Sequence, residues 1–224
     1  MPRAALLAIA VAAFAAAAWV TLSPGDAALP LLLVAFALVL GGFVWLESGT
    51  GSAKEVALVA VLGGAAAAGR VLFAFVPGVQ PVTVTAVAAG AALGARVGFA
   101  VGAVAALVSN FYLGQGIWTP WQMLAWGGCG VAGALASRLI RNRWAFAALC
   151  FALGFAFSTA LDLWYWYSFW PHSWEALTVV VGRGFAFSAF HAVGNVVFAL
   201  AIGPELRRLL ERYGRRLRVE VAWA

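Results

Sequence analysis

The stretch NFYLGQGIWTPWQMLAW (residues 110–126) combines amides and indoles with no charged residue. Tryptophans at the headgroup level of a membrane would form an aromatic belt, but a belt needs no amides, which are costly near lipid unless paired. Large aromatic faces with a few amides suit the binding of an uncharged or zwitterionic organic molecule. The candidate binding residues in this stretch are Asn110, Gln115, Trp118, Trp121 and Gln122.

Two arginines lie in or beside apolar segments, toward the side that we expect to face outward. Arg70 and Arg183 either snorkel to lipid headgroups or hold a carboxylate, phosphate or carbonyl group of a ligand. Arg70 is followed by VPGVQPVT (76–83), a loop stiffened by two prolines that carries Gln80. Asp162 either balances one of these arginines or only marks the end of a helix.

The last apolar segment carries a further polar group. Ser188, His191 and Asn195 are spaced three and four apart, so they share one face of a helix. Such a face either makes hydrogen bonds between helices or forms the polar wall of a pocket that opens outward. We therefore include His191 and Asn195 among the candidate substrate-binding residues.

The sequence does not predict catalysis. It has no GxSxG elbow and no P-loop pattern, and Asp162 is the only acid placed for an intramembrane aspartyl protease, which needs two. His172 and His191 are too isolated for a zinc site, and Cys129 and Cys150 lie in apolar runs as packing residues rather than as a disulfide. We expect no enzyme activity, no metal and no cofactor. A membrane enzyme that acts on lipid head groups, with His191 as base, is the one enzymatic alternative.

The elements that must position these residues follow from composition. The chain has 224 residues, of which 65% are hydrophobic and 10% charged, and its mean hydropathy is +0.97. This composition indicates an integral membrane protein, and apolar runs of about 20 residues indicate helices rather than barrel strands. We predict an all-α, polytopic membrane helical bundle. Its apolar segments are 4–22, 29–47, 54–75, 80–94, 96–113, 121–140, 144–164 and 182–204.

The chain divides into three parts. We assign an N-terminal two-helix membrane hairpin to 1–50, a six-helix substrate-binding membrane core to 51–205 and a basic cytoplasmic tail to 206–224. The first apolar segment is either a membrane helix or a signal peptide, with Arg3 as its positively charged N-terminal region. The tail is an amphipathic basic helix, which we expect to lie on the inner membrane surface.

The segment 80–94 is too short to span a membrane. About fifteen residues at ~1.5 Å each give ~22 Å, which is less than the ~30 Å hydrocarbon core. We expect the span that begins at Pro81 to line a cavity, because irregular backbone is tolerated only where protein or water covers it. A further pattern, with glycines four apart, predicts two helices in close contact around the turn at Arg96. These glycines are Gly90, Gly94, Gly98 and Gly102.

Lysine and arginine set the orientation of a membrane protein, because they favour the cytoplasmic side. The expected external loops, near 23–28, 76–80, 114–120 and 165–181, contain neither residue. The expected cytoplasmic parts carry Lys54, Arg96, Arg138, Arg141 and Arg143, and the tail adds Arg207, Arg208, Arg212, Arg215, Arg216 and Arg218. We predict a bacterial cytoplasmic (inner) membrane protein with both termini in the cytoplasm. The net charge of +6 then reflects loops that face anionic lipid rather than nucleic acid.

Small residues three or four apart run from Ala53 into the segment 54–75, where they form a smooth ridge along one side of a helix. We call this set the small-residue ridge. It consists of Ala53, Ala57, Ala60, Gly64 and Ala68. Such a ridge either packs inside the bundle or docks another membrane protein.

Residues from about 54 to 204 resemble the substrate-specific component, or S component, of energy-coupling factor (ECF) transporters. The resemblance covers about two thirds of the chain. The matching stretches are AKEVALVAVLGGAAAAGR, PGVQPVT, SNFYLGQGIWTPWQM and the small-residue sixth segment. S components are six-helix bacterial membrane proteins that capture vitamins from outside. The N-terminal hairpin departs from the minimal pattern of this family.

The resemblance implies partners as well as a ligand. A transmembrane coupling protein and two ATPase subunits on separate chains would drive uptake, and Ala53, Ala57, Ala60 and Gly64 would dock the coupling protein. The WTPWQM stretch is similar to the predicted cobalamin group of the family, while riboflavin or another flat vitamin suits the same aromatic walls. A structural or assembly membrane protein without a small-molecule ligand is the alternative from another class. In that case the tryptophans form a belt and the arginines snorkel.

Overall fold

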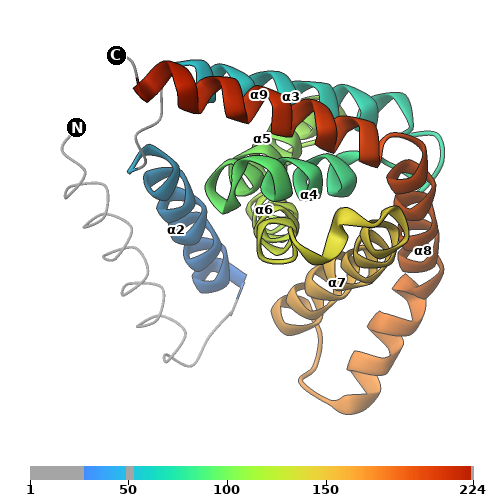
Figure 1. Ribbon diagram of the computed structural model, residues 1–224. Coiled ribbons are helices and arrows are strands. Elements are labelled where there is room, and N and C mark those ends of the chain that lie inside the picture. The colour runs from blue at the N-terminus through green and yellow to red at the C-terminus, as the bar shows by residue number, and fades with distance from the viewer. Residues whose placement is uncertain (1–27, 49–52, 223–224) are drawn as a thin grey trace.

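The computed structural model describes residues 28–48 and 53–222, with side chains as far as Arg216 (Figure 1). Every regular element in these ranges is a helix. The first expected segment, 4–22, lies outside the described residues. The helices are α2 (Ala28–Glu47), α3 (Ala53–Leu72), α4 (Val82–Leu93), α5 (Ala95–Leu113), α6 (Thr119–Leu135), the short 3-10 helix η1 (Leu139–Arg141), α7 (Arg143–Phe169), α8 (Trp174–Ala201) and α9 (Gly203–Ala222).

Five of the described helices are long and apolar enough to cross a membrane, namely α2, α3, α5, α7 and α8. A helix satisfies its own backbone groups, which lipid cannot do. The chain is therefore an all-α membrane protein with the helical bundle that its composition predicts. Helix α2, the described helix of the expected N-terminal hairpin, lies beside α5 and α6, where Gly42 faces the ring of Phe99.

Helix α4 is short and central. Its 12 residues give a length of ~18 Å, and all of them from Val82 to Gly90 are buried. Helices α5, α6 and α9 surround it (Figure 1). The segment was expected to line a cavity, but from Val82 to Gly90 it is buried in protein, and only its last turn, at Ala91 and Ala92, reaches one.

Helices α4, α5 and α6 approach closely through glycine. Gly90 lies against the Gly130 carbonyl, and a Cβ added at Gly130 would collide with the backbone of Gly98. A Cβ at Gly98 would lie only 2.6 Å from the Gly90 Cα atom. The glycine spacing thus predicted the contact around Arg96 correctly, and α6 completes it. The backbones can approach this far only because no side chain stands between them.

The boundary between α7 and α8 differs from the prediction. A long external loop was expected at 165–181, but α7 continues to Phe169 and α8 already begins at Trp174. The aromatic run after Asp162 contains no helix breaker before Pro171, so the helix continues through it. Ser173 then caps α8, because its hydroxyl accepts a hydrogen bond of 3.2 Å from the Ala176 amide.

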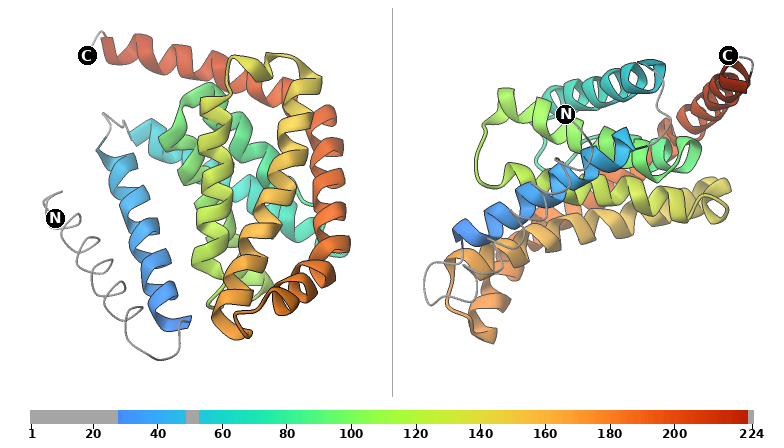
Figure 2. Two further views of the ribbon diagram at one scale, coloured as in Figure 1. Left: turned by 90° about the horizontal axis from the view of Figure 1, so that it is seen from below. Right: turned by 90° about the vertical axis from the view of Figure 1, so that its left-hand side faces the viewer.

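Helix α9 runs across one end of the bundle, over the ends of α6, α7 and α8 (Figure 2, left). It packs on α4, and Leu210 is buried in the core. Arg207 donates hydrogen bonds to two carbonyls of the α6–α7 connection, at Ile140 (2.6 Å) and Ser137 (2.9 Å). The tail is therefore attached to the protein along its first turns, whereas its amphipathic pattern alone predicted contact with lipid.

Candidate functional site

Polar side chains from five segments meet at the end of the bundle opposite α9. Arg70, in the last turn of α3, is at their centre. Its Nε donates to Gln80 Oε1 (2.9 Å), and its Nη1 donates to Ser109 Oγ (2.6 Å) and to Asn110 Oδ1 (2.6 Å). The guanidinium also lies over the ring of Trp126, 4.8 Å from its centroid.

Asn110 links Arg70 to the start of α6. Its side chain is fully buried, and its Nδ2 donates to Thr119 Oγ1 (2.9 Å) and to Gln122 Oε1 (2.8 Å). Thr119 in turn donates to Gln115 Oε1 (2.9 Å), within the connection between α5 and α6. Three of the amides predicted from residues 110–126 therefore belong to one hydrogen-bond network.

His191 joins this network from α8. Its ring is completely buried, with Nδ1 2.6 Å from the Gly78 carbonyl and Nε2 3.4 Å from Thr83 Oγ1. The indole Nε1 of Trp126 donates to the same threonine hydroxyl (3.2 Å). Gln80 Nε2 lies 3.5 Å from His191 Nδ1, which connects this part to Arg70. Below, "the Arg70 network" means Arg70, Gln80, Thr83, Ser109, Asn110, Gln115, Thr119, Gln122, Trp126 and His191.

Local sequence explains how these side chains are positioned. Gly114 ends α5 with a φ of 111°, a left-handed conformation that glycine adopts without strain. Pro120 then occupies the first turn of α6, where its missing N–H costs nothing. Gly78, with a φ of 76°, brings its backbone against α8, and a Cβ there would lie 3.0 Å from the Phe187 carbonyl.

The electrostatics of the Arg70 network are unusual because no carboxylate among the described residues pairs with Arg70. Neutral oxygen atoms and the Trp126 ring hold its charge instead. Its Nη2 group donates no hydrogen bond to any described residue. The indole Nε1 of Trp121, at the start of α6, is buried and likewise has no acceptor in the described part of the chain. Two donors at this end are therefore unused.

The predicted binding residues outside the Arg70 network have other surroundings. Trp118 is 42% exposed and folds its ring over Gly116, while Trp121 stacks on Trp164 with ring centroids 5.9 Å apart. Asn195 is fully buried between α7 and α8, where its Nδ2 donates to the Cys150 carbonyl (3.3 Å). It therefore contributes to helix packing.

Asp162 lies in the second half of α7 and Arg183 in the first half of α8. Arg183 was expected to open its helix but lies within α8, and its guanidinium is 5.9 Å from the Trp170 ring centroid. A Cβ at Gly184 would lie 2.7 Å from Asp162 Oδ2, so the carboxylate packs against the α8 backbone. Neither residue joins the Arg70 network, and the described residues show no ion pair between them.

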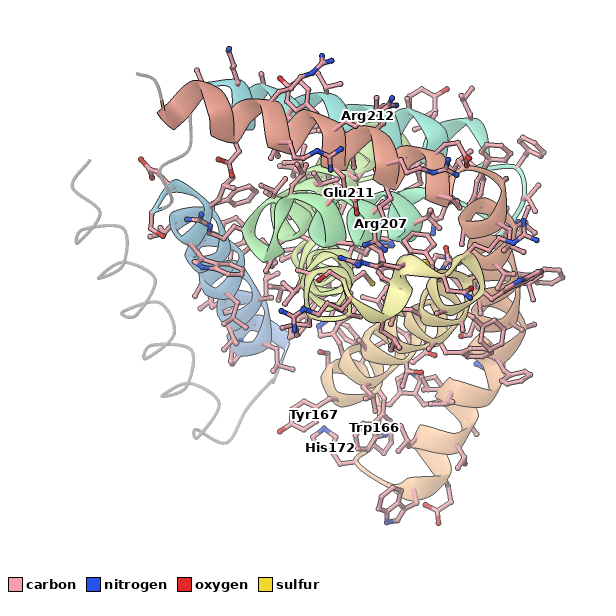
Figure 3. All side chains as sticks on the ribbon, viewed as in Figure 1. Trp166, Tyr167, His172, Arg207, Glu211 and Arg212 are labelled. Atoms are coloured by element: carbon pink, nitrogen blue, oxygen red, sulfur yellow. The ribbon has the colours of Figure 1, made fainter. Side chains whose placement is uncertain are left out.

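The ends of α7 and α8 carry an aromatic cluster. His172 stacks on Tyr167 with centroids 4.6 Å apart, and Trp166 lies 5.7 Å from the same imidazole. Figure 3 shows these three side chains at the end of the molecule far from Arg207 and Glu211. Exposed aromatic residues at one end of membrane helices are typical of a belt at the lipid headgroups.

Four members of the Arg70 network were not predicted: Thr83, Ser109, Thr119 and Trp126. Each stands next to a predicted residue or in the same stretch, yet a hydroxyl in an apolar run often only bonds back to its own helix. Ser109 does this as well, because its Oγ lies 2.7 Å from the Ala105 carbonyl. The cluster of polar residues near position 110 could have indicated them, had the prediction included its hydroxyl groups and Trp126 beside its amides.

Most polar groups of the Arg70 network form hydrogen bonds with one another. A cavity of about 900 Å³ lies instead at the opposite end, under α9. Among the described residues, no three His, Cys, Asp or Glu side chains are grouped to bind a metal ion. Searches of family models, curated proteins and solved structures gave no match to this chain. The resemblance to S components therefore stays a prediction from sequence motifs.

Proposed function

We propose that this protein captures a small organic molecule at the Arg70 network and serves as the substrate-binding subunit of an ECF-type vitamin transporter. The observation that carries the proposal is the guanidinium of Arg70, which lies inside a membrane bundle with no carboxylate partner among the described residues. Charged side chains at such depth are expensive and usually mark a functional site. A ligand carboxylate or carbonyl would accept hydrogen bonds from the two unused N–H groups of Nη2.

The other residues at this end suit the same ligand. The indole N–H of Trp121 has no acceptor among the described residues, and the ring of Trp118, three residues earlier, is partly exposed. The amide of Gln122 lies at the start of α6, and the amide of Gln115 lies in the connection before it. Aromatic contact area with a few directional donors is the composition of a small-molecule site. The cobalamin-like or flat-vitamin ligands proposed from the resemblance offer both carbonyl groups and large faces.

The small-residue ridge supports the proposed coupling protein. Ala53, Ala57 and Ala60 are exposed on α3, while the core side of this helix uses Val59 and Leu62 instead. No described atom lies within 4 Å of a Cβ built at Gly64. A smooth exposed ridge on a membrane helix allows another helix to approach closely. The bacterial inner membrane and the cytoplasmic termini are part of this proposal.

The test is mass spectrometry of small molecules extracted from the purified full-length protein. We expect a bound compound with a carboxylate or carbonyl group, and calorimetry should give its affinity. Arg70→Lys keeps the positive charge but loses the planar guanidinium and its several N–H donors, so ligand affinity should fall roughly tenfold or more. Arg183→Lys makes the same substitution outside the Arg70 network and should change affinity less than about twofold.

Two results would count against the proposal. One is purified protein that retains no small molecule and binds neither cobalamin nor riboflavin in calorimetry. The other is equal loss of affinity in Arg70→Lys and Arg183→Lys, which would remove the Arg70 network from the binding site.

A structural membrane protein is the second candidate, and one observation favours it. Asn110 satisfies its buried amide within the protein, because it accepts from Arg70 and donates to Thr119 and Gln122, as a polar network that fixes helix positions would do. Under this alternative, Arg70→Lys would lower the unfolding temperature, and growth on scarce vitamin would not change. The proposed function requires that growth under these conditions also fall.

A further inference from the structure

The cavity under α9 is a separate feature at the other end of the molecule. Its volume is about 900 Å³. The C-terminal turn of α4, the connection from α6 to α7 and the first half of α9 form its walls. The side chains of Arg207 and Glu211 lie under α9 in Figure 3. The basic side chains that line it are Arg138, Arg141, Arg143, Arg207, Arg208 and Arg215.

The charges in this cavity do not balance. Two acids, Glu205 and Glu211, line it together with the six arginines, which leaves a net positive charge. Both acids are already engaged, because Glu211 pairs with Arg207 (2.8 Å) and Glu205 with Arg208 (2.9 Å). The other four arginines have no carboxylate partner among the described residues.

The walls of the cavity are held in place by buried contacts. Arg207 is 8% exposed and bonds two backbone carbonyls of the α6–α7 connection, so α9 is fastened to that connection. Asn142 caps α7 by accepting a 2.7 Å hydrogen bond from the Trp144 amide. Arg138 and Arg141 therefore project from a connection that is fixed on both sides. A fixed set of unpaired guanidinium groups requires little rearrangement to bind an anion.

We propose that this arginine cavity binds a phosphate group, carried by an anionic phospholipid or by a soluble phosphate compound. Arginine forks match phosphate oxygens bidentately, and several of them together suit a group with more than one negative charge. Apolar side chains flank the basic residues, with Leu139 75% and Trp144 58% exposed. Basic residues beside exposed apolar ones at the end of membrane helices are typical of lipid headgroup recognition.

The experiment uses the full-length protein in a neutral detergent. Short-chain phosphatidylglycerol, short-chain phosphatidylcholine and inorganic phosphate are added separately, and binding is measured by native mass spectrometry and calorimetry. We expect phosphatidylglycerol or inorganic phosphate to bind in preference to phosphatidylcholine, whose headgroup carries no net charge. Phosphatidylglycerol alone would identify lipid as the source of the phosphate, and inorganic phosphate alone would identify a soluble compound.

Paired variants locate the site. Arg138→Gln with Arg141→Gln removes two cavity charges and keeps Arg143 in the same connection, so affinity should fall about tenfold or more. Arg96→Gln with Arg216→Gln removes the same charge from positions outside the cavity and should change affinity less than about twofold. Monodisperse gel filtration and an unchanged unfolding temperature would show that both pairs fold.

The proposal would be overturned by three outcomes. Equal weakening by both variant pairs would mean general surface electrostatics. Equal affinity for phosphatidylcholine and phosphatidylglycerol, with no inorganic phosphate bound, would remove the role of the anion. Absence of all binding in the folded wild-type protein would exclude the site itself. None of these outcomes involves the Arg70 network, which is tested with different ligands.

Discussion

At the scale of single residues, Arg70 shows how a charge is kept inside a membrane bundle. Gln80, Ser109 and Asn110 supply three neutral oxygen acceptors, and the face of Trp126 supplies a fourth favourable contact. Hydrogen bonds to charged groups contribute about 1.5–3 kcal/mol each. They offset part of the desolvation of the guanidinium without neutralising it. The remaining charge is what makes this end attractive to an anionic or carbonyl-bearing ligand.

Arg70→Ala should lower the free energy of unfolding by about 2–4 kcal/mol, because it leaves the buried oxygen atoms of Ser109 and Asn110 without their donor. Tryptophan fluorescence during thermal unfolding in detergent would measure the change. Arg183→Ala is the control, since that side chain contributes only a cation–π contact and should cost less than about 1 kcal/mol. Similar losses in the two variants would contradict this account of the Arg70 network.

At the scale of elements, close packing of α4 against α5 and α6 places the Arg70 network. Helix α4 is too short to reach across lipid by itself, so it depends on its neighbours for cover. Gly90, Gly98 and Gly130 allow the three backbones to touch. Gln80 and Thr83 come directly before and at the start of α4, so its position sets where they meet Arg70 and His191.

Gly130→Ala should destabilise the protein by about 2 kcal/mol or more, because the new methyl group would collide with the Gly98 backbone, which cannot rotate away. Gly128→Ala is a matched control two positions away, where nothing lies within 4 Å of the added Cβ. Its stability should stay unchanged or rise by up to about 1 kcal/mol. Unfolding temperatures in detergent would compare the two, and equal values would refute the close contact.

A second contact between elements attaches α9 to the α6–α7 connection. Arg207→Ala removes both bonds to the α6–α7 connection, so α9 should detach locally and become sensitive to protease. Hydrogen exchange of residues 203–216 should rise by about tenfold or more, as expected from the loss of about 1.5–3 kcal/mol. Arg208→Ala removes an exposed ion pair and an exposed hydrogen bond to the Pro204 carbonyl within α9, and should have almost no effect. Unchanged exchange in Arg207→Ala would contradict the attachment.

At the scale of the whole molecule, two polar ends are separated by an apolar bundle. One end holds the aromatic cluster and the other holds the arginine cavity (Figure 3). The Arg70 network lies between the last turns of α3 and α5 and the start of α6, away from the α6–α7 connection. The connections rich in arginine therefore gather on one side, as the orientation rule for membrane proteins requires. The cytoplasmic assignment of that side is our prediction.

Labelling of single cysteines in intact cells tests this orientation. Ile117→Cys should react with a membrane-impermeant maleimide, while Leu139→Cys should react only after permeabilisation, because their loops lie at opposite ends. The native Cys129 and Cys150 are buried and provide the unlabelled background. The reverse pattern would show that the arginine cavity faces outward, against the orientation predicted from charge.

Much of this protein was determined by the sequence alone. Long apolar runs in lipid have no stable form other than helices, so the helical bundle, the short length of α4 and the glycine contact could be predicted. Six predicted binding residues also meet in one network, because polar side chains inside an apolar bundle must find each other. These six are Arg70, Gln80, Asn110, Gln115, Gln122 and His191.

Only the tertiary structure decided which partners each group has. Arg70 reaches residues 10, 39 and 40 positions away, and no local pattern encodes such pairs. Asp162 and Arg183 share the polar character of the others, but α7 and α8 hold them apart from Arg70. Arg207 binds backbone carbonyls, and because every residue carries one, the types of residues in the sequence do not indicate this contact. The arginine cavity exists because those bonds close α9 over the α6–α7 connection.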